Sequence, residues 1–214
     1  MGCCRMPKDT FFNLPAKKRK RIETAALNEF AYFPYLKSNT NRIIENADIS
    51  KGSFYQYFEN KKDLYKYLMK SYGQLKMEYM LEREEELNKK DFFEKLEFLF
   101  LLGIEFARDY PLVTKMSTRL IKGDNEKLKQ EIYSENRSET ENFYQQLLQS
   151  AAAKGEINES LDIQFLSYLI TSFSTELIDY FFRKDYQSEA DNFEEILSYL
   201  DQLIFILKNG IQSK

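Results

Sequence analysis

The sequence predicts an all-α protein built from long helices. Apolar residues recur at helical spacing along almost the whole chain, and no segment shows the two-residue alternation of a half-buried strand. Helix breakers are scarce, because the 214 residues include only seven Gly and four Pro, and all four Pro lie within the first 111 residues. A hydrophobic content of 43% with 30% charged residues is typical of a globular protein and argues against wholesale disorder.

The first four helices are expected to follow a loose tail at residues 1–12. Pro15 suits the first position of a helix, where its missing N–H costs nothing. Ser38 or Thr40 can cap the second helix, and Ser50 can cap the third by accepting a hydrogen bond from an N–H of the first turn. The four expected helices span residues 15–33, 39–47, 51–57 and 61 to about 85.

Five further helices are expected after Gly73, where the character of the chain changes. Residues 92–106 are apolar nearly all round, which predicts a buried helix. Gly155 is expected to end the longest helix, since glycine is common just past a helix end. The five expected helices span residues 91–108, 112–121, 126–154, 162–183 and 191–208, which makes about nine helices in all.

The net charge of −3 conceals an asymmetry between the two ends of the chain. Residues 1–73 contain 14 Lys and Arg against 7 Asp and Glu, a charge of +7, so the remainder carries −10. A basic front on an acidic body suits a protein of which only one end approaches a polyanion. Chance clustering of surface charge is the alternative.

The residue inventory also narrows the chemistry. The absence of His excludes a His-based metal site, a Ser-His-Asp triad and an imidazole base. The two Cys are adjacent, at Cys3 and Cys4, and cannot form a disulfide framework, which fits a reducing compartment. The longest strongly apolar run, residues 96–106, is too short and too charged to span a bilayer. We therefore expect a cytoplasmic protein that is not an enzyme and holds no cofactor or metal.

The segment from Ser38 to Tyr65 holds a short helix, a tight turn and a second short helix rich in Ser, Lys, Gln and Tyr, which is how a helix-turn-helix DNA reader is built. A recognition helix enters the major groove with small and polar residues first, as the run Ser50-Lys51-Gly52-Ser53 would. The candidate DNA-binding residues are Thr40, Arg42, Ser50, Lys51, Gly52, Ser53, Tyr55, Gln56, Tyr57, Lys61 and Lys62.

Each of these side chains has an expected role. Lys51 can donate to guanine or to a phosphate, and Gln56 can pair with adenine. Tyr55 and Tyr57 offer hydroxyls to phosphates or a ring edge to thymine methyls. The residues at the starts of the second and fourth expected helices are placed to hold the DNA backbone, and they are Thr40, Arg42, Lys61 and Lys62.

A run of five basic residues crowds the first turns of the first long helix, at residues 17–21. Basic residues there oppose the helix dipole, which is locally unfavourable. Such a cost is easier to understand if phosphates lie nearby, although a solvated run of charge is the alternative.

Residues 15–65 resemble the operator-reading segment of the tetracycline-repressor (TetR) family. The family pattern of Val-Ser-Lys-Gly-Ser/Thr followed by aromatic residues, and later Lys-acidic-Leu, is matched by the runs at residues 47–58 and 62–64. Two positions depart from it. Asp48 replaces the turn glycine, and aspartate tolerates the left-handed conformation better than most residues. Gln56 stands where an aromatic residue or His is common, which is expected to alter which bases are read.

This resemblance implies a helix-turn-helix domain at residues 13–60, a connecting helix at 61–85 and a ligand-binding and dimerisation domain at 86–214. A pocket in the third of these domains would be largely apolar, with Glu105 and Arg108 as polar anchors. The candidate ligand-binding residues are Phe93, Phe100, Glu105, Arg108, Tyr110, Tyr133, Phe143, Tyr144 and Tyr168.

The last two helices carry broad apolar faces that two subunits could join into a four-helix interface. The candidate interface residues are Phe165, Leu169, Phe173, Leu177, Phe181, Phe193, Ile196, Leu200, Leu203 and Leu207. Packing within their own chain is the alternative for both sets.

The sequence therefore predicts a ligand-responsive transcriptional regulator, a repressor that binds a palindromic operator in double-stranded DNA as a homodimer. A small, largely apolar inducer would enter the body, shift the helix at residues 61–85 and release the DNA. An architectural or division-type DNA-binding protein without a small-molecule ligand is one alternative, and a helical carrier of lipophilic molecules is another. A membrane-surface role for the basic tail is a third, although no membrane partner is expected.

Overall fold

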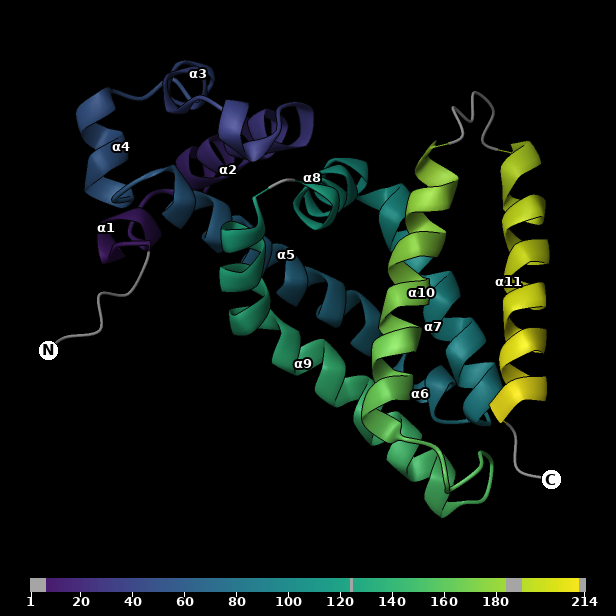
Figure 1. Cartoon of the computed structure of the whole chain (residues 1–214). Coiled ribbons are helices and arrows are strands. Elements are labelled where there is room, and N and C mark those ends of the chain that lie inside the picture. Colours follow the sequence, from purple (N-terminus) through teal and green to yellow (C-terminus); the bar gives the residue numbers. More distant parts are fainter. Residues whose placement is uncertain (1–6, 124, 184–189, 212–214) are drawn as a thin grey trace, which may run out of the picture. The chain divides into compact units, whose positions relative to one another are not determined.

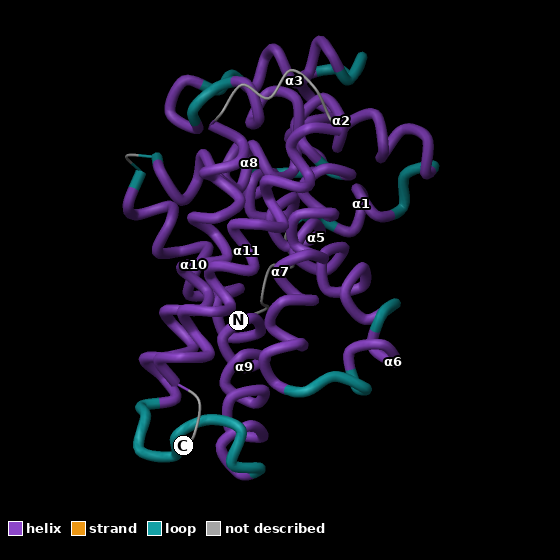
Figure 2. Tube along the Cα trace, turned by 90° about the vertical axis from the view of Figure 1, so that its right-hand side faces the viewer, coloured by secondary structure: helices purple, strands orange, loops and turns teal. Residues whose placement is uncertain are grey.

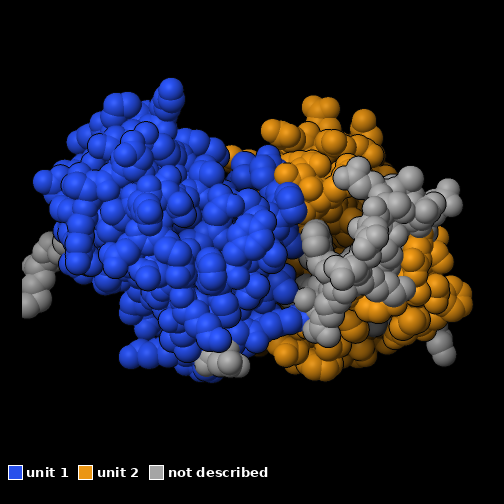
Figure 3. Space-filling view, turned by 90° about the horizontal axis from the view of Figure 1, so that it is seen from above, with its two compact units in different colours: residues 1–76, 110–135 blue, residues 77–109, 136–214 orange. Residues whose placement is uncertain are grey.

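The computed structural model describes residues 7–123, 125–183 and 190–211, and these residues form helices joined by short connections, without a strand among them (Figures 1 and 2). They divide into two compact units (Figure 3). Unit 1 contains residues 1–76 and 110–135, and unit 2 contains residues 77–109 and 136–214. The division expected from the sequence follows chain order, whereas the compact units interleave, because α8 (Pro111–Lys122) packs against α2 (Ala16–Tyr32).

Unit 1 holds the helices expected at its start, within a few residues of their predicted bounds. After α2 come a short 3-10 helix η1 (Tyr35–Lys37), α3 (Thr40–Asn46), α4 (Lys51–Tyr57) and α5 (Lys61–Leu81), whose first part belongs to this unit. α8 joins them through its side chains: the Arg119 Nε donates to the Ala31 carbonyl at 2.8 Å. Pro15 precedes α2 as its N-cap rather than opening the helix as predicted.

The tail predicted to be loose is ordered from residue 7 onwards, so that part of the prediction is wrong. Residues Asp9–Phe12 form α1, and the Phe11 side chain is fully buried, with its ring centroid 4.9 Å from that of Phe58. The chain also pairs with the end of α4, where Thr10 Oγ1 donates to the Gln56 carbonyl at 2.6 Å. A four-residue helix is too short to show periodicity in the sequence, and its place depends on tertiary contacts such as these. Residues 1–6 lie outside the described residues.

Unit 2 contains the end of α5, α6 (Glu84–Leu87), α7 (Phe92–Asp109), most of α9 (Glu126–Ala153), α10 (Ile163–Arg183) and α11 (Ala190–Ile211). α7 is buried as predicted, and it packs against both α10 and α11. Gly155 follows the end of α9 with a φ of 69°, which confirms its predicted role there. Gly210, expected just beyond the last helix, lies within α11. No helix in the described part of the chain is both long and apolar enough to cross a bilayer.

Candidate nucleic-acid interface

The α3–turn–α4 segment packs on the core of unit 1 through apolar side chains. Ile43, Phe54 and Phe58 are completely buried in the core of unit 1. Asp48 makes the turn in the left-handed region, at a φ of 49°, as its sequence position predicts. Ser50 caps α4 by accepting a hydrogen bond from the Ser53 N–H at 3.0 Å, which confirms the predicted cap.

The cap of α3 differs from the prediction. Asn39 is the N-cap, and its Oδ1 accepts from the Asn41 N–H at 2.8 Å. Ser38, one of the two predicted caps, is buried and donates instead to the Tyr35 carbonyl at 2.7 Å. Thr40, the other, is the half-buried first residue of the helix.

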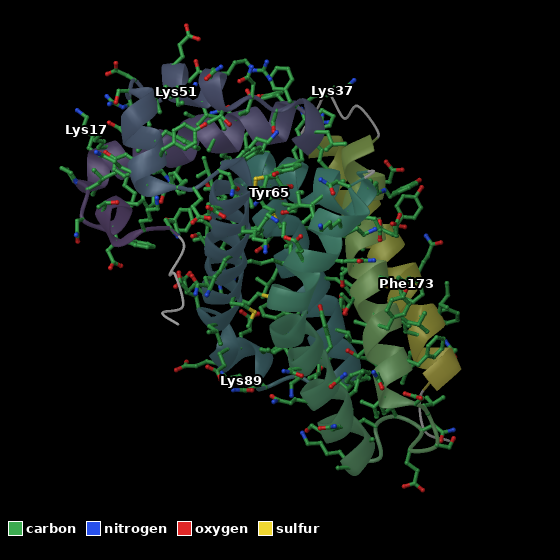
Figure 4. The ribbon with its side chains drawn as sticks, turned by 60° about the vertical axis from the view of Figure 1, so that its left-hand side comes forward. Lys17, Lys37, Lys51, Tyr65, Lys89 and Phe173 are labelled. Carbon is green, nitrogen blue, oxygen red and sulfur yellow. The ribbon has the colours of Figure 1, made fainter. Side chains whose placement is uncertain are left out.

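One side of α4 is buried in unit 1, and the opposite side is exposed. Lys51, Gly52, Tyr55 and Gln56 are exposed, and Lys51 points away from the helices of unit 1 (Figure 4). A Cβ added at Gly52 would meet only the Ser50 Oγ, at 3.8 Å, so this glycine is not required by packing within the chain. The exposed face of α4 can therefore reach an outside partner closely with lysine, amide and phenol groups.

Arg42 was predicted to hold the DNA backbone, but its guanidinium is engaged within the protein. It donates to both carboxylate oxygens of buried Glu29, with Nε to Oε2 at 2.9 Å, and its Nη2 donates to the Lys37 carbonyl at 3.2 Å. It also stacks on the ring of Phe33, 4.1 Å from the centroid. These hydrogen bonds with Glu29 raise the pKa of Arg42. Glu29 further accepts from the Asn39 N–H at 2.7 Å, so the pair fastens α2 to the start of α3.

Three more side chains that were predicted to contact DNA are either buried or bound to other groups of the protein. The Lys61 Nζ donates to the carbonyls of Tyr35 and Ser38 at 2.7 and 2.8 Å, and burial lowers its pKa. Lys62 pairs with Glu131 of α9 at 3.0 Å. Tyr57 is buried against Phe11, which leaves its ring in the core rather than on a DNA-facing surface. All three were placed correctly on their helices, but periodicity does not show which long-range partner a side chain finds.

The predicted ligand-binding residues separate into several environments. Phe93, Phe100 and Tyr144 are buried in one apolar cluster of unit 2, with Phe143 half-buried against it. Burial raises the pKa of Tyr144. The other described members lie outside that cluster. Tyr110 belongs to unit 1, Glu105 is half-buried and Tyr168 is exposed. Arg108 is also exposed, and its Nε lies 3.7 Å from the Asp109 Oδ1. The side chain of Tyr133 lies outside the described residues.

The predicted interface residues also divide. Leu200 and Leu207 are buried in the core of unit 2, and Leu177 and Leu203 pack against that core, so these four serve their own chain. Phe165 and Phe173 are exposed and Leu169 is half-buried. The structure adds exposed apolar side chains that sequence reasoning missed, and they are Tyr180, Phe205 and Ile206. The side chains of Phe181, Phe193 and Ile196 lie outside the described residues.

A helix-turn-helix packed on a helical core, with an exposed polar face on its second helix, is the arrangement of a DNA-binding protein of the transcription-regulator class. Comparison with known proteins agrees. The pattern described as bacterial regulatory proteins of the tetR family matches residues 22–68. A TetR family transcriptional regulator from Chloroflexus aurantiacus J-10-FL is 30% identical, with a TM-score of 0.69 over 98% of this chain and 100% of that one. The chain belongs to the TetR family of transcriptional regulators.

Two further relatives concern fatty acids. The fatty acid metabolism regulator protein of Bacillus subtilis (strain 168) is 25% identical over 202 residues, which is 92% of this chain and 97% of that protein. The crystal structure of the transcriptional regulator FadR from Bacillus subtilis in complex with stearoyl-CoA has a TM-score of 0.73 at 22% identity, over 90% of this chain and 99% of that one. This second likeness concerns the fold.

Proposed function

We propose that this regulator is a repressor which binds a palindromic operator as a homodimer and leaves it when a small, largely apolar inducer binds. The observation that carries the proposal is the exposed face of α4, where Lys51, Gly52, Tyr55 and Gln56 face outward while Phe54 is buried beneath them. Such a division is what a recognition helix needs, because its buried side fixes the register in which its outer side meets the major groove. The protein would act in the cytoplasm, beside its DNA.

Base reading falls to the side chains that are exposed and long. Gln56 can form a paired hydrogen bond with adenine, and Lys51 can donate to guanine O6 and N7. The Tyr55 ring can contact a thymine methyl or donate through its hydroxyl to a phosphate. Ser50, Ser53 and Thr40 lie at the ends of α3 and α4 and can add phosphate contacts that position the protein.

The homodimer is supported by apolar side chains that their own chain leaves uncovered. Phe165 on α10 is 58% exposed, and Phe205 and Ile206 on α11 are 68% and 65% exposed. The two helices lie side by side in unit 2, where the Tyr180 and Tyr199 rings are 5.6 Å apart. An exposed apolar face of this kind is typical of an interaction surface. A twofold homodimer formed through this face would carry two copies of α4, one for each half-site of a palindrome.

We propose that the inducer is a fatty-acyl compound. The proposal draws on the curated relative that regulates fatty acid metabolism and on the aromatic core of unit 2, in which Phe93, Phe100 and Tyr144 are buried. An acyl chain suits an apolar lining of this composition. Release requires the ligand to favour the geometry that does not fit the operator, and DNA must then weaken ligand binding by the same factor.

A titration of the protein–operator complex tests this function. Fluorescence anisotropy of a labelled operator would be followed as a long-chain acyl-CoA is added, with free coenzyme A as the matched control. The proposal expects the acyl compound to release the DNA and free coenzyme A to leave it bound. If saturating acyl-CoA of every chain length left the operator affinity unchanged, fatty-acyl compounds would be ruled out as inducers.

A further inference from the structure

The basic run at residues 17–21 separates into two groups on the surface of α2. Lys18 and Arg19 turn towards their own chain: Lys18 Nζ lies 5.9 Å from the centroid of the Tyr57 ring, and Arg19 Nη1 donates to the Phe12 carbonyl at 3.3 Å. Lys17, Lys20 and Arg21 are exposed on the other side of the helix, and Lys17 projects from unit 1 in Figure 4. The run is therefore not one uniformly solvated stripe.

These three cations line an open groove of about 540 Å³ in unit 1. The polar residues that line it are Lys17, Lys20, Arg21, Thr24, Asn28 and Asn46. The members from α2 follow helical spacing and so form one stripe along that helix, while Asn46 closes the groove from the end of α3. None of the lining residues is acidic.

The charge on this stripe is not neutralised by the surrounding chain, except at Arg21. Lys17 and Lys20 have no hydrogen bond or ion pair within the described residues. The one acidic residue of α2 close in sequence, Glu23, accepts a hydrogen bond from the Tyr67 hydroxyl at 2.6 Å. Two lysines without partners beside hydroxyl and amide groups make a surface that suits an anion with several oxygen atoms.

Arg21 links the groove to the recognition helix. Its Nη2 donates to the Asp48 carbonyl at 3.0 Å, and its Nη1 lies 3.3 Å from the Asp48 carboxylate. Asp48 is the turn residue that precedes Ser50, the cap of α4. The groove therefore adjoins the helix-turn-helix on its α2 side.

We propose that this groove is a phosphate-binding site which extends the DNA contact beyond the helix-turn-helix, with Lys17 and Lys20 as its ligands for phosphodiester oxygens and Arg21 as the residue that positions it. The residues that carry it precede the matched family segment at residues 22–68. The inference rests on the proposed function, because it assumes that α4 is the DNA reader. A free phosphorylated compound shares the same chemistry, but the open shape of the groove and its place beside the turn favour a strand that passes along it.

The consequence is a contact that contributes affinity without sequence preference. Each phosphate neutralised adds about 0.9 to the slope of log K against log salt. Because the proposed homodimer carries this groove twice, the double variant Lys17→Ala/Lys20→Ala should reduce that slope by roughly 2 to 4 and weaken binding by roughly 30- to 1,000-fold at about 0.15 M salt. The sequence recovered by selection from random DNA should not change, because neither lysine touches a base edge.

The experiment measures operator affinity across a salt series for the wild type, the double variant and a matched control. Lys89→Ala/Lys154→Ala is the control, because both lysines are exposed in unit 2 and the change in net charge is the same. The inference expects a lower slope for the groove variant and the wild-type slope for the control, with similar thermal stability for all three. Equal slopes for the wild type and the groove variant would overturn it.

Inorganic pyrophosphate, added at constant ionic strength, separates the two sources of phosphate. The inference expects it to displace DNA no better than chloride does. Calorimetric binding of pyrophosphate to the wild type but not to the groove variant, with a salt slope equal in both proteins, would assign the groove to a free phosphorylated compound and overturn the DNA-backbone site. A wild type without any preferred DNA sequence would instead overturn the proposed function, so the two failures are distinguishable.

Discussion

Arg21 holds Asp48 by two contacts, one to the carboxylate at 3.3 Å and one to the main-chain carbonyl at 3.0 Å. Asp48 stands where the family pattern has a turn glycine, and its φ of 49° is one that glycine adopts without strain. The substitution of Asp for Gly in this chain thus places a carboxylate within reach of α2. The turn before the recognition helix is tied to α2 by a side chain as well as by the core.

Two replacements of Asp48, neither of which keeps its carboxylate, measure the free-energy cost of the left-handed backbone at this turn. Asp48→Gly removes the strain and the exposed carboxylate together, so its thermal stability should equal or slightly exceed that of the wild type. Asp48→Ala keeps the left-handed backbone without a side-chain contact and should be about 1 kcal/mol less stable than Asp48→Gly. Thermal unfolding of both variants measures the difference, about 2–4 °C for a chain of this size. An Ala variant as stable as the Gly variant would show that the turn is not strained.

Replacement of Gly52 should have opposite effects on the stability of the protein and on its affinity for DNA. Gly52→Ala meets nothing closer than the Ser50 Oγ at 3.8 Å, and alanine favours a helix interior by about 0.5–1 kcal/mol over glycine. The variant should therefore be at least as stable as the wild type yet bind DNA more weakly, because the added methyl group stands on the face that approaches the DNA. Denaturant unfolding and operator anisotropy check the two halves. Unchanged affinity would mean that this end of α4 does not approach DNA.

The buried carboxylate of Glu29 should be important for the stability of unit 1. Glu29→Gln keeps an oxygen for the Asn39 N–H but loses the charge that binds Arg42, which should cost about 2 kcal/mol, the scale of a charge-assisted hydrogen bond. Urea unfolding of the variant gives the value. Glu45→Gln, at an exposed position on α3, is the control and should leave the midpoint where it was. A Glu29→Gln midpoint equal to that of the wild type would show that the pair with Arg42 adds nothing to stability.

Glu131 predicts a dependence of stability on pH. Hydrogen bonds from Lys62, then from Lys66, hold the pKa of its carboxyl below the usual value of 4.5. A carboxyl whose pKa is lowered on folding stabilises the protein above the unfolded-state pKa, and that contribution is lost as the pH falls through the folded-state pKa. The melting temperatures of the wild type and Glu131→Gln should therefore differ at pH 6 and converge as the pH falls below 4.5 and then through the folded-state pKa. A difference that is constant across this range would contradict the assignment.

The exposed apolar side chains of α11 predict the oligomeric state. If the proposed homodimer forms through this face, Phe205→Glu/Ile206→Glu should convert it to a monomer and weaken operator binding, because a single half-site contact remains. Light scattering after size exclusion gives the mass. Gln202→Glu, an exposed polar position on the same helix, is the control and should stay dimeric. A double variant that remains dimeric would place the interface elsewhere.

Local sequence signals were sufficient to predict the main features of the helix-turn-helix. The cap at Ser50, the left-handed turn at Asp48 and the bounds of α4 follow from residue type at a given position, and the structure has all three. The intramolecular partners of Arg42 and Lys61 could not be predicted because they lie far along the chain, at Glu29 for the first and at the carbonyls of Tyr35 and Ser38 for the second. Position on a helix shows that a cation is available but not what it binds.

The apolar helices of unit 2 were harder for a related reason. α11 carries large apolar side chains on more than one face, so periodicity could not decide that Leu200 and Leu207 are buried while Phe205 and Ile206 are exposed. That choice depends on the packing of α11 against α7. In the same way, α1 is too short to show a pattern, and its place is decided by the burial of Phe11.

Selection of bound fragments from random DNA, at about 0.15 M salt, tests most directly the claim that α4 reads an operator. It would be run with the wild type and with Gln56→Ala. The account predicts a palindrome whose half-sites are centred about 34–36 Å apart, or a multiple of that, from the wild type. It predicts that Gln56→Ala loses the preference at one symmetric position in each half-site. Recovery of no preferred sequence, or of an identical palindrome from both proteins, would contradict it.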